Sequence, residues 1–237
     1  MEQFNFDNNL LDAVPQIVNA SEHHMALLFL VDTSGSMGAK IIGTHGSPID
    51  ELNNALNRFK AEVCMDEHTK DILDVAIVEF NTEYRVVQEF SPIEYMKPVE
   101  LQASGATYIN AALETAINMV TERSRFYRRA GAEPYKPWIV LISDGAPMDA
   151  SIDEMANKIN ELVEQEKLAF WSLAVEGADM DVLHKLSGRR VLKLDGYDFS
   201  GFLDWANKSM RAVSQSSPGE KIKGQALPAS VTIDDLM

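Results

Sequence analysis

The chain has 237 residues, 46% hydrophobic and 24% charged, a composition typical of a globular protein with a substantial core. Its 21 basic and 36 acidic residues give a net charge of −15, which repels polyanions and disfavours nucleic acid and anionic membranes as partners. Because the N-terminus lacks the pattern of a secretion signal and no stretch has the roughly 18 apolar residues of a membrane span, we expect a cytoplasmic protein.

Six apolar runs of strand length recur along the chain. Most are nearly continuous rather than alternating, as expected for strands buried on both faces of a sheet. They occupy residues 26–31, 73–80, 84–90, 138–143, 168–175 and 190–194. Only "NTE" separates the second run from the third, which is too short for a crossover, so we expect an antiparallel hairpin with 84–90 at an edge.

Helical patterns separate most of the other strands. The first, over residues 48–63, is opened by a capping box of Ser47 and Asp50. A second follows over 109–120, and a third over 155–163 is opened by a similar box of Ser151 and Glu154. A short helix is predicted over 179–187 and a last one over 199–213.

This alternation indicates a doubly wound α/β fold. We expect a mostly parallel, six-stranded sheet with one antiparallel edge strand and helices on both faces. The domain should cover residues 20–214, after an N-terminal extension over 1–19. The remaining residues, 215–237, read as a flexible tail, because the polar run "SQSSPGEKIKGQ" is typical of a linker. For the final "ALPASVTIDDLM" we favour a disordered tail over a docking segment.

Two polar clusters follow predicted strands, and a third precedes a predicted helix. The first strand runs into "DTSGSMG", which holds Asp32, Ser34 and Ser36. The segment "ASGATYIN" places Thr107 before a helix, and Asp144 follows the strand "WIVLIS". Ligands of open parallel sheets bind beyond the carboxyl ends of the strands, so these side chains should share one rim. Carboxylates and hydroxyls are hard oxygen ligands, which predicts a Mg²⁺ or Mn²⁺ site.

Two other interpretations of the same residues stay open. Asp32, Ser34 and Ser36 form an ordinary turn if their oxygens only cap backbone amides. A metal-dependent phosphatase would use Asp32 as its nucleophile, but it would want a second acid two residues later, where this chain has Ser34. No phosphate-binding G-x-x-x-x-G-K-[ST] loop is present, and no nucleophile-base pair is expected on the rim. We therefore favour a binding module over an enzyme.

In this order, the three segments resemble the metal-ion-dependent adhesion site of von Willebrand factor type A domains, over roughly residues 27–213. The resemblance implies that the metal is held by the hydroxyls of Ser34, Ser36 and Thr107. It implies that Asp32 and Asp144 act directly or through water. It further implies that an acidic side chain of a partner protein fills the remaining metal position, and that the last helix shifts when the partner binds.

A finer resemblance concerns the segments "ASGATYINAALETA" and "KPWIVLISDGAPMD". They are similar to intracellular bacterial type A proteins of the tellurite-resistance, TerY-like group, which implies a role in a stress response. This chain departs from that group in its N-terminal stretch and in segment 39–46, where we interpret His45 as a solvated loop residue. Asp149 is interpreted as a surface or helix-entry residue rather than a metal ligand.

Overall fold

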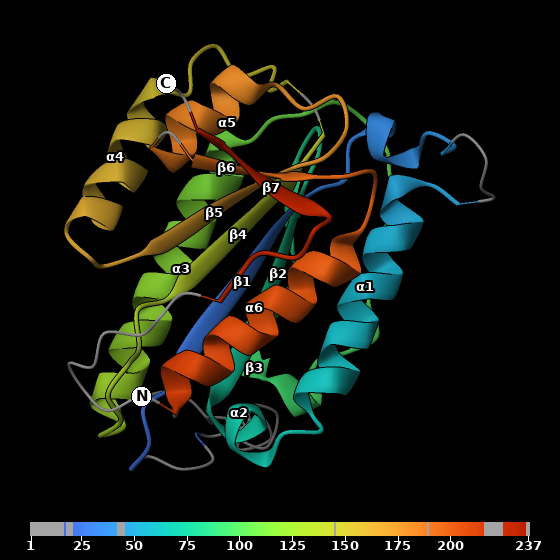
Figure 1. Cartoon of the computed structure of the whole chain (residues 1–237). Helices are drawn as coiled ribbons and strands as arrows, with labels where there is room; N and C mark the ends of the chain where they lie inside the picture. The colour runs from blue at the N-terminus through green and yellow to red at the C-terminus, as the bar shows by residue number, and fades with distance from the viewer. Residues whose placement is uncertain are drawn as a thin grey trace, which may run out of the picture.

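A seven-stranded sheet runs through the middle of the molecule, with helices on both faces (Figure 1). This computed structural model describes residues 17, 21–41, 46–144, 146–188, 190–215 and 225–235. The strands are β1 (Met25–Asp32), β2 (Leu73–Phe80), β3 (Tyr84–Pro92), β4 (Trp138–Ser143), β5 (Ala169–Ala174), β6 (Arg190–Leu194) and β7 (Val231–Asp235). His45 and the linker 216–224 lie outside the described residues.

The order of the strands is β3-β2-β1-β4-β5-β6-β7. β2, β1, β4, β5 and β6 are parallel, whereas β3 and β7 run antiparallel to their neighbours at the two edges. The predicted α/β fold with a mostly parallel sheet is confirmed, and so are the hairpin of β2 with β3 and the edge position of β3. The carboxyl ends of β1 and β4 are therefore neighbours on one rim.

The seventh strand corrects the predicted count of six. Val231–Asp235 pairs along the whole length of β6, and Val231 is buried among core residues of the sheet. A flexible tail is therefore the wrong description of residues 231–235. β6 would otherwise present a row of unpaired backbone groups, and a strand that covers them satisfies these groups.

The helices divide between the two faces of the sheet, which explains the nearly continuous apolar strands. Their bounds are α1 (Pro48–Val63), α2 (Glu67–Ile72), α3 (Asn110–Arg129), α4 (Asp153–Glu164), α5 (Met180–Ser187) and α6 (Phe199–Ser214). Alternate β1 residues serve opposite faces: Phe29 packs in the cluster that includes α1 and α6, and Leu28 in the one that includes α3, α4 and α5. No described helix combines the length and apolar character needed to cross a membrane.

Local capping sets most of the helix starts. The capping box of Ser47 and Asp50 is present at α1, as predicted. The box predicted from Ser151 and Glu154 is wrong, since α4 begins at Asp153 and the Ser151 hydroxyl accepts from the amide of Asp153. The short helix α2 was not predicted; its amino end is capped by the carboxylate of Asp66.

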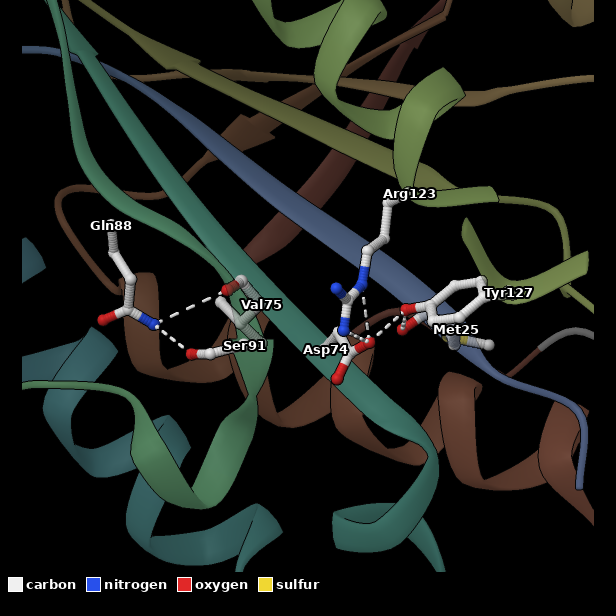
Figure 2. A network of polar contacts seen from close by, with 7 residues as sticks. All are labelled: Met25, Asp74, Val75, Gln88, Ser91, Arg123 and Tyr127. Carbon is white, nitrogen blue, oxygen red and sulfur yellow. Dashed lines mark hydrogen bonds and ion pairs between the residues drawn. The ribbon is translucent and has the colours of Figure 1, made fainter. Parts of the chain in front are cut away.

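A buried polar network lies at the end of the sheet opposite the rim (Figure 2). Arg123 of α3 donates to the carboxylate of Asp74, at the start of β2, with Nε at 2.9 Å, and the Tyr127 hydroxyl donates to the same oxygen. Arg123 and Asp74 are 8% and 3% exposed. This cluster ties the carboxyl-terminal half of α3 to the amino end of β2, far from the predicted metal ligands.

Candidate metal centre

Hydrogen bonds join four of the five predicted ligands into one chain at the rim. The Ser34 amide donates to Asp32 Oδ1 at 2.8 Å, which closes a tight turn directly after β1. The hydroxyl oxygens of Ser34 and Ser36 lie 3.0 Å apart, at hydrogen-bonding distance. Ser36 Oγ then donates to Asp144 Oδ1 at 2.8 Å. The ends of β1 and β4 thus bring together residues that lie more than a hundred positions apart in the sequence.

The fifth predicted ligand, Thr107, is brought to the same rim by its loop. The amide of Ser104 donates to the carbonyl of Thr33 at 2.8 Å, and the amide of Gly35 donates to the carbonyl of Gly105 at 3.0 Å. Gly105 has φ +73, and a Cβ there would lie 2.5 Å from Thr82 Oγ1, so this position requires glycine. Thr107 itself is buried. Two backbone hydrogen bonds thus hold the loop after β1 against the loop that carries Thr107.

Two supporting residues were not singled out from the sequence as part of the site. Ser143, the last residue of β4, donates its hydroxyl to Asp32 Oδ2 at 2.7 Å. Asp149 accepts from the amides of Ile109 and Asn110 at 2.7 and 3.2 Å, and so caps the start of α3, two residues after Thr107. Asp149 is thus a helix-entry residue, as expected, although the helix is α3 and not α4. The only sequence signal for Ser143 was a hydroxyl in an otherwise apolar strand.

The two carboxylates of the rim are buried. Asp32 is 0% exposed and Asp144 is 8% exposed. Burial raises the pKa of Asp32, and it raises the pKa of Asp144 to about 6, with a further contribution from the charge of Asp32. Within the described part of the chain, no Lys, Arg or His forms an ion pair with either group. A divalent cation would supply the missing positive charge.

The donor set suits a hard cation. It contains two carboxylates and three hydroxyls, whereas zinc and copper sites usually contain histidine or thiolate. Among the described residues, no group of three or more His, Cys, Asp and Glu side chains gathers as a metal cluster. Ser36 is exposed, while Asp32 and Ser34 are buried, so the centre opens to solvent on the side of Ser36. The residues present fit a resident Mg²⁺ or Mn²⁺.

Solved structures share this fold. The pilus adhesin SpaC from Lactobacillus rhamnosus GG matches with 12% identity and a TM-score of 0.63, over 81% of this chain and 31% of SpaC. The chain thus spans about a third of the length of SpaC. The vWF domain of the type V pili tip protein Mfa5 from Porphyromonas gingivalis matches with 10% identity and a TM-score of 0.56, over 83% of this chain and 98% of that one.

A third similar structure is proximal thread matrix protein 1 from the mussel byssus, with a zinc-occupied MIDAS motif. It has 17% identity and a TM-score of 0.51, and the match covers 84% of this chain and 46% of the mussel protein. At such identities the likeness shows the fold alone. No curated protein matches the chain.

A family model gives the assignment that these distant structures cannot. The model of the von Willebrand factor type A domain matches residues 26–191, well over half of the chain. The matched region runs from β1 to β6 and includes every predicted ligand of the rim. The chain therefore belongs to the von Willebrand factor type A domain family.

Proposed function

We propose that this chain is a protein-binding module that depends on a divalent metal ion. Asp32, Ser34, Ser36, Thr107 and Asp144 would hold Mg²⁺ or Mn²⁺, and an acidic side chain of a partner protein would complete its coordination. The observation that carries this proposal is the pair of buried carboxylates, joined through serine hydroxyls and left without a cationic partner in the described residues. The zinc-occupied MIDAS of the similarly folded mussel protein supports a divalent ion.

The mixture of donors explains why an outside carboxylate would be attracted. Two carboxylates balance the charge of a divalent ion. The other donors are neutral hydroxyls, which add no negative charge that would repel an incoming carboxylate. Hard cations of this kind favour six oxygen donors, and the described rim offers five candidate side chains. The chemistry that the ion would supply is Lewis-acid attraction for one more anionic oxygen.

Titration calorimetry tests the metal centre directly. Wild-type protein should bind one Mg²⁺ or Mn²⁺, and Asp32→Ala and Asp144→Ala should each abolish the signal, because each removes a buried anionic donor. Asp153→Ala is a matched control, since this carboxylate is exposed and bonded to Ser151 and Lys185 instead. An unchanged isotherm in both rim variants would contradict the proposal.

We also propose that the chain has no hydrolase activity. Position 34, where a phosphatase that used Asp32 would want its second acid, is Ser34, and its hydroxyl bonds within the serine chain of the rim. Purified protein should therefore not turn over p-nitrophenyl phosphate in Mg²⁺. Turnover that is lost in Asp32→Asn would favour the phosphatase instead.

The finer assignments are proposals based on the sequence segments quoted above. They comprise closeness to the TerY-like group, a role in a bacterial stress or tellurite response, and a cytoplasmic location. Deletion of the gene in its host, followed by growth on tellurite, tests the first two together. Sensitivity that is rescued by the wild-type chain but not by Asp32→Ala would connect this role to the metal centre.

A further inference from the structure

Two large apolar side chains are exposed on the rim beside the metal centre. Tyr108 is 44% exposed and Met148 is 64% exposed, whereas most large apolar side chains of the described residues are buried. Tyr108 follows the predicted ligand Thr107 directly, and the amide of Met148 donates to the carbonyl of Thr107 at 2.7 Å. The two residues therefore flank a metal ligand. Tyrosine and methionine are enriched at protein interfaces.

Hydrogen bonds hold the backbone at both residues of this pair. The amide of Tyr108 donates to the carbonyl of Asn81 at 2.8 Å, which ties it to the turn between β2 and β3. The next residue after Met148, Asp149, caps α3 through its carboxylate. Because the backbone is already fixed, a partner that packs on these side chains loses little free energy to loop ordering.

The position of the pair limits what can bind it. Successive Cα atoms are about 3.8 Å apart, so a segment whose carboxylate reaches the metal has its neighbouring side chains over residues adjacent to Thr107. The loop that follows β5 lies against the metal loop, since a Cβ on Gly177 would be 3.6 Å from the carbonyl of Asp144. That loop carries exposed Glu176, which disfavours a second acid in the partner.

We propose that the partner presents a short segment with one carboxylate and, within about two residues of it, an apolar side chain that packs on Tyr108 and Met148. This inference rests on the proposed metal-dependent function. The metal would select the acid, and the apolar pair would select which acid-bearing segment binds. Partners with the acid alone, or with the acid among further acids, would bind weakly.

A displayed peptide library tests the inference without knowledge of the natural partner. Each peptide carries one fixed central glutamate and random flanking positions; bound clones are collected from the full chain in Mg²⁺ and released with EDTA. Apolar and aromatic residues should be enriched within two positions of the glutamate. For a selected peptide, Tyr108→Ala and Met148→Ala should each weaken binding by about tenfold. Both variants should keep wild-type affinity for Mg²⁺.

Matched controls stand at the other end of the molecule. Tyr95 and Met65 are 57% and 81% exposed, and they follow β3 and α1 at ends remote from the rim, so Tyr95→Ala and Met65→Ala should not change peptide binding. The inference would be wrong if peptides bind in Mg²⁺ but show no apolar enrichment, or if they bind the Tyr108 and Met148 variants as tightly as the wild type. Either result would leave the proposed metal-dependent function standing. If Mg²⁺ binds but no peptide does, both the inference and the proposed carboxylate recognition are wrong.

Discussion

At the scale of single residues, the candidate metal centre gathers two acids where water has little access. Asp144 lies close enough to Asp32 for the charge of one carboxylate to raise the pKa of the other. Hydrogen bonds from Ser34, Ser36 and Ser143 offset only part of the cost of burying these charges. The rim therefore concentrates buried negative charge, and both protons and cations should relieve it.

This gives a prediction about pH. A folded-state pKa of about 6 for Asp144, against 3.8 for an ordinary Asp, means that the folded chain holds its proton more tightly than the unfolded chain. The stability from this group is present below the ordinary pKa and is lost as pH rises through about 6. Metal must displace that proton, so Mg²⁺ should raise the melting temperature more at about pH 7.5 than at about pH 5.

Differential scanning fluorimetry in Mg²⁺ or EDTA measures both effects. Asp144→Asn should reduce the dependence of the melting temperature in EDTA on pH, because an amide does not titrate; Asp32, whose pKa is also raised by burial, keeps the remaining dependence. Asp144→Asn should also remove the response to Mg²⁺. A stabilisation by Mg²⁺ that is equal at both pH values would contradict this account.

Ser143 provides a second prediction at this scale. Its hydroxyl orients Asp32 by a buried hydrogen bond of 2.7 Å, so Ser143→Ala should weaken Mg²⁺ binding by about tenfold while the fold is kept. Ser172→Ala is a close control, since Ser172 is fully buried on the neighbouring strand β5 and its hydroxyl has no hydrogen-bond partner in the described structure. Calorimetry measures the Mg²⁺ affinity of both variants. Equal losses of affinity would mean that Ser143 acts through packing and not through the orientation of Asp32.

At the scale of elements, α3 connects the two polar clusters of the molecule. Its first turn is capped by Asp149 beside the metal centre, and its last turns carry Arg123 and Tyr127 into the network around Asp74. A helix of 20 residues is about 30 Å long, so the clusters lie at opposite ends of the domain. The network should therefore contribute to stability and not to metal binding.

Replacement of Asp74 tests this separation. Asp74→Ala leaves the buried guanidinium of Arg123 without its carboxylate, and we expect a loss of about 3–5 kcal/mol in the free energy of unfolding. Glu122→Ala removes an exposed ion pair with Arg125 on the same helix and should cost less than about 1 kcal/mol. Urea unfolding in EDTA measures the losses, and Mg²⁺ affinity should be unchanged. A small loss for Asp74→Ala would mean that the network is dispensable.

The sequence predicted most of the rim because parallel strands impose its geometry. Asp32 ends β1 and Asp144 follows β4. These two strands pair directly, so the proximity of the two residues follows from strand order alone. Contacts between distant loops carry no such signature. The cap of α3 comes from Asp149, some forty residues away, and the local pattern around Thr107 gave no indication of it.

The missed strand β7 has a different cause. The segment "VTIDD" is short and polar on alternate positions, and it follows a run of linker composition, so its local propensity is weak. It is a strand because β6 offers a free edge, which is a property of the assembled sheet. The capping residue predicted for α4 was wrong for a related reason, since a box-like spacing alone does not fix which residue caps the helix.

At the scale of the whole molecule, β7 changes the expected behaviour of the last helix. The resemblance to type A domains implies that α6 shifts when a partner binds, and in this structure the chain returns after α6 to pair with β6. Trp205 of α6 donates its indole N–H to the carbonyl of Gln225 at 3.1 Å, and Arg211 pairs with Asp66 at 2.7 Å. A shift of α6 must therefore disturb the segment before β7 as well.

Hydrogen exchange can detect such coupling. With Mg²⁺ and a selected glutamate peptide, protection should change in α6 and β7 together with residues 32–38, provided that the peptide prefers one position of α6. Mg²⁺ with an alanine-substituted peptide separates the effect of the metal from that of the partner. Changes confined to the rim loops would make the protein a static binding platform.

The rim loops hold one another through main-chain atoms, and this has a consequence for how recognition can diverge. Ser104, Tyr108 and Met148 each secure a neighbouring loop by a backbone amide, which any residue other than proline provides. The exposed side chains at positions 108 and 148 can therefore be exchanged while the proposed metal ligands stay in place. Under the proposed function, a lineage or a designer would thus obtain binders of new specificity from one frame, all of them released by the same chelator.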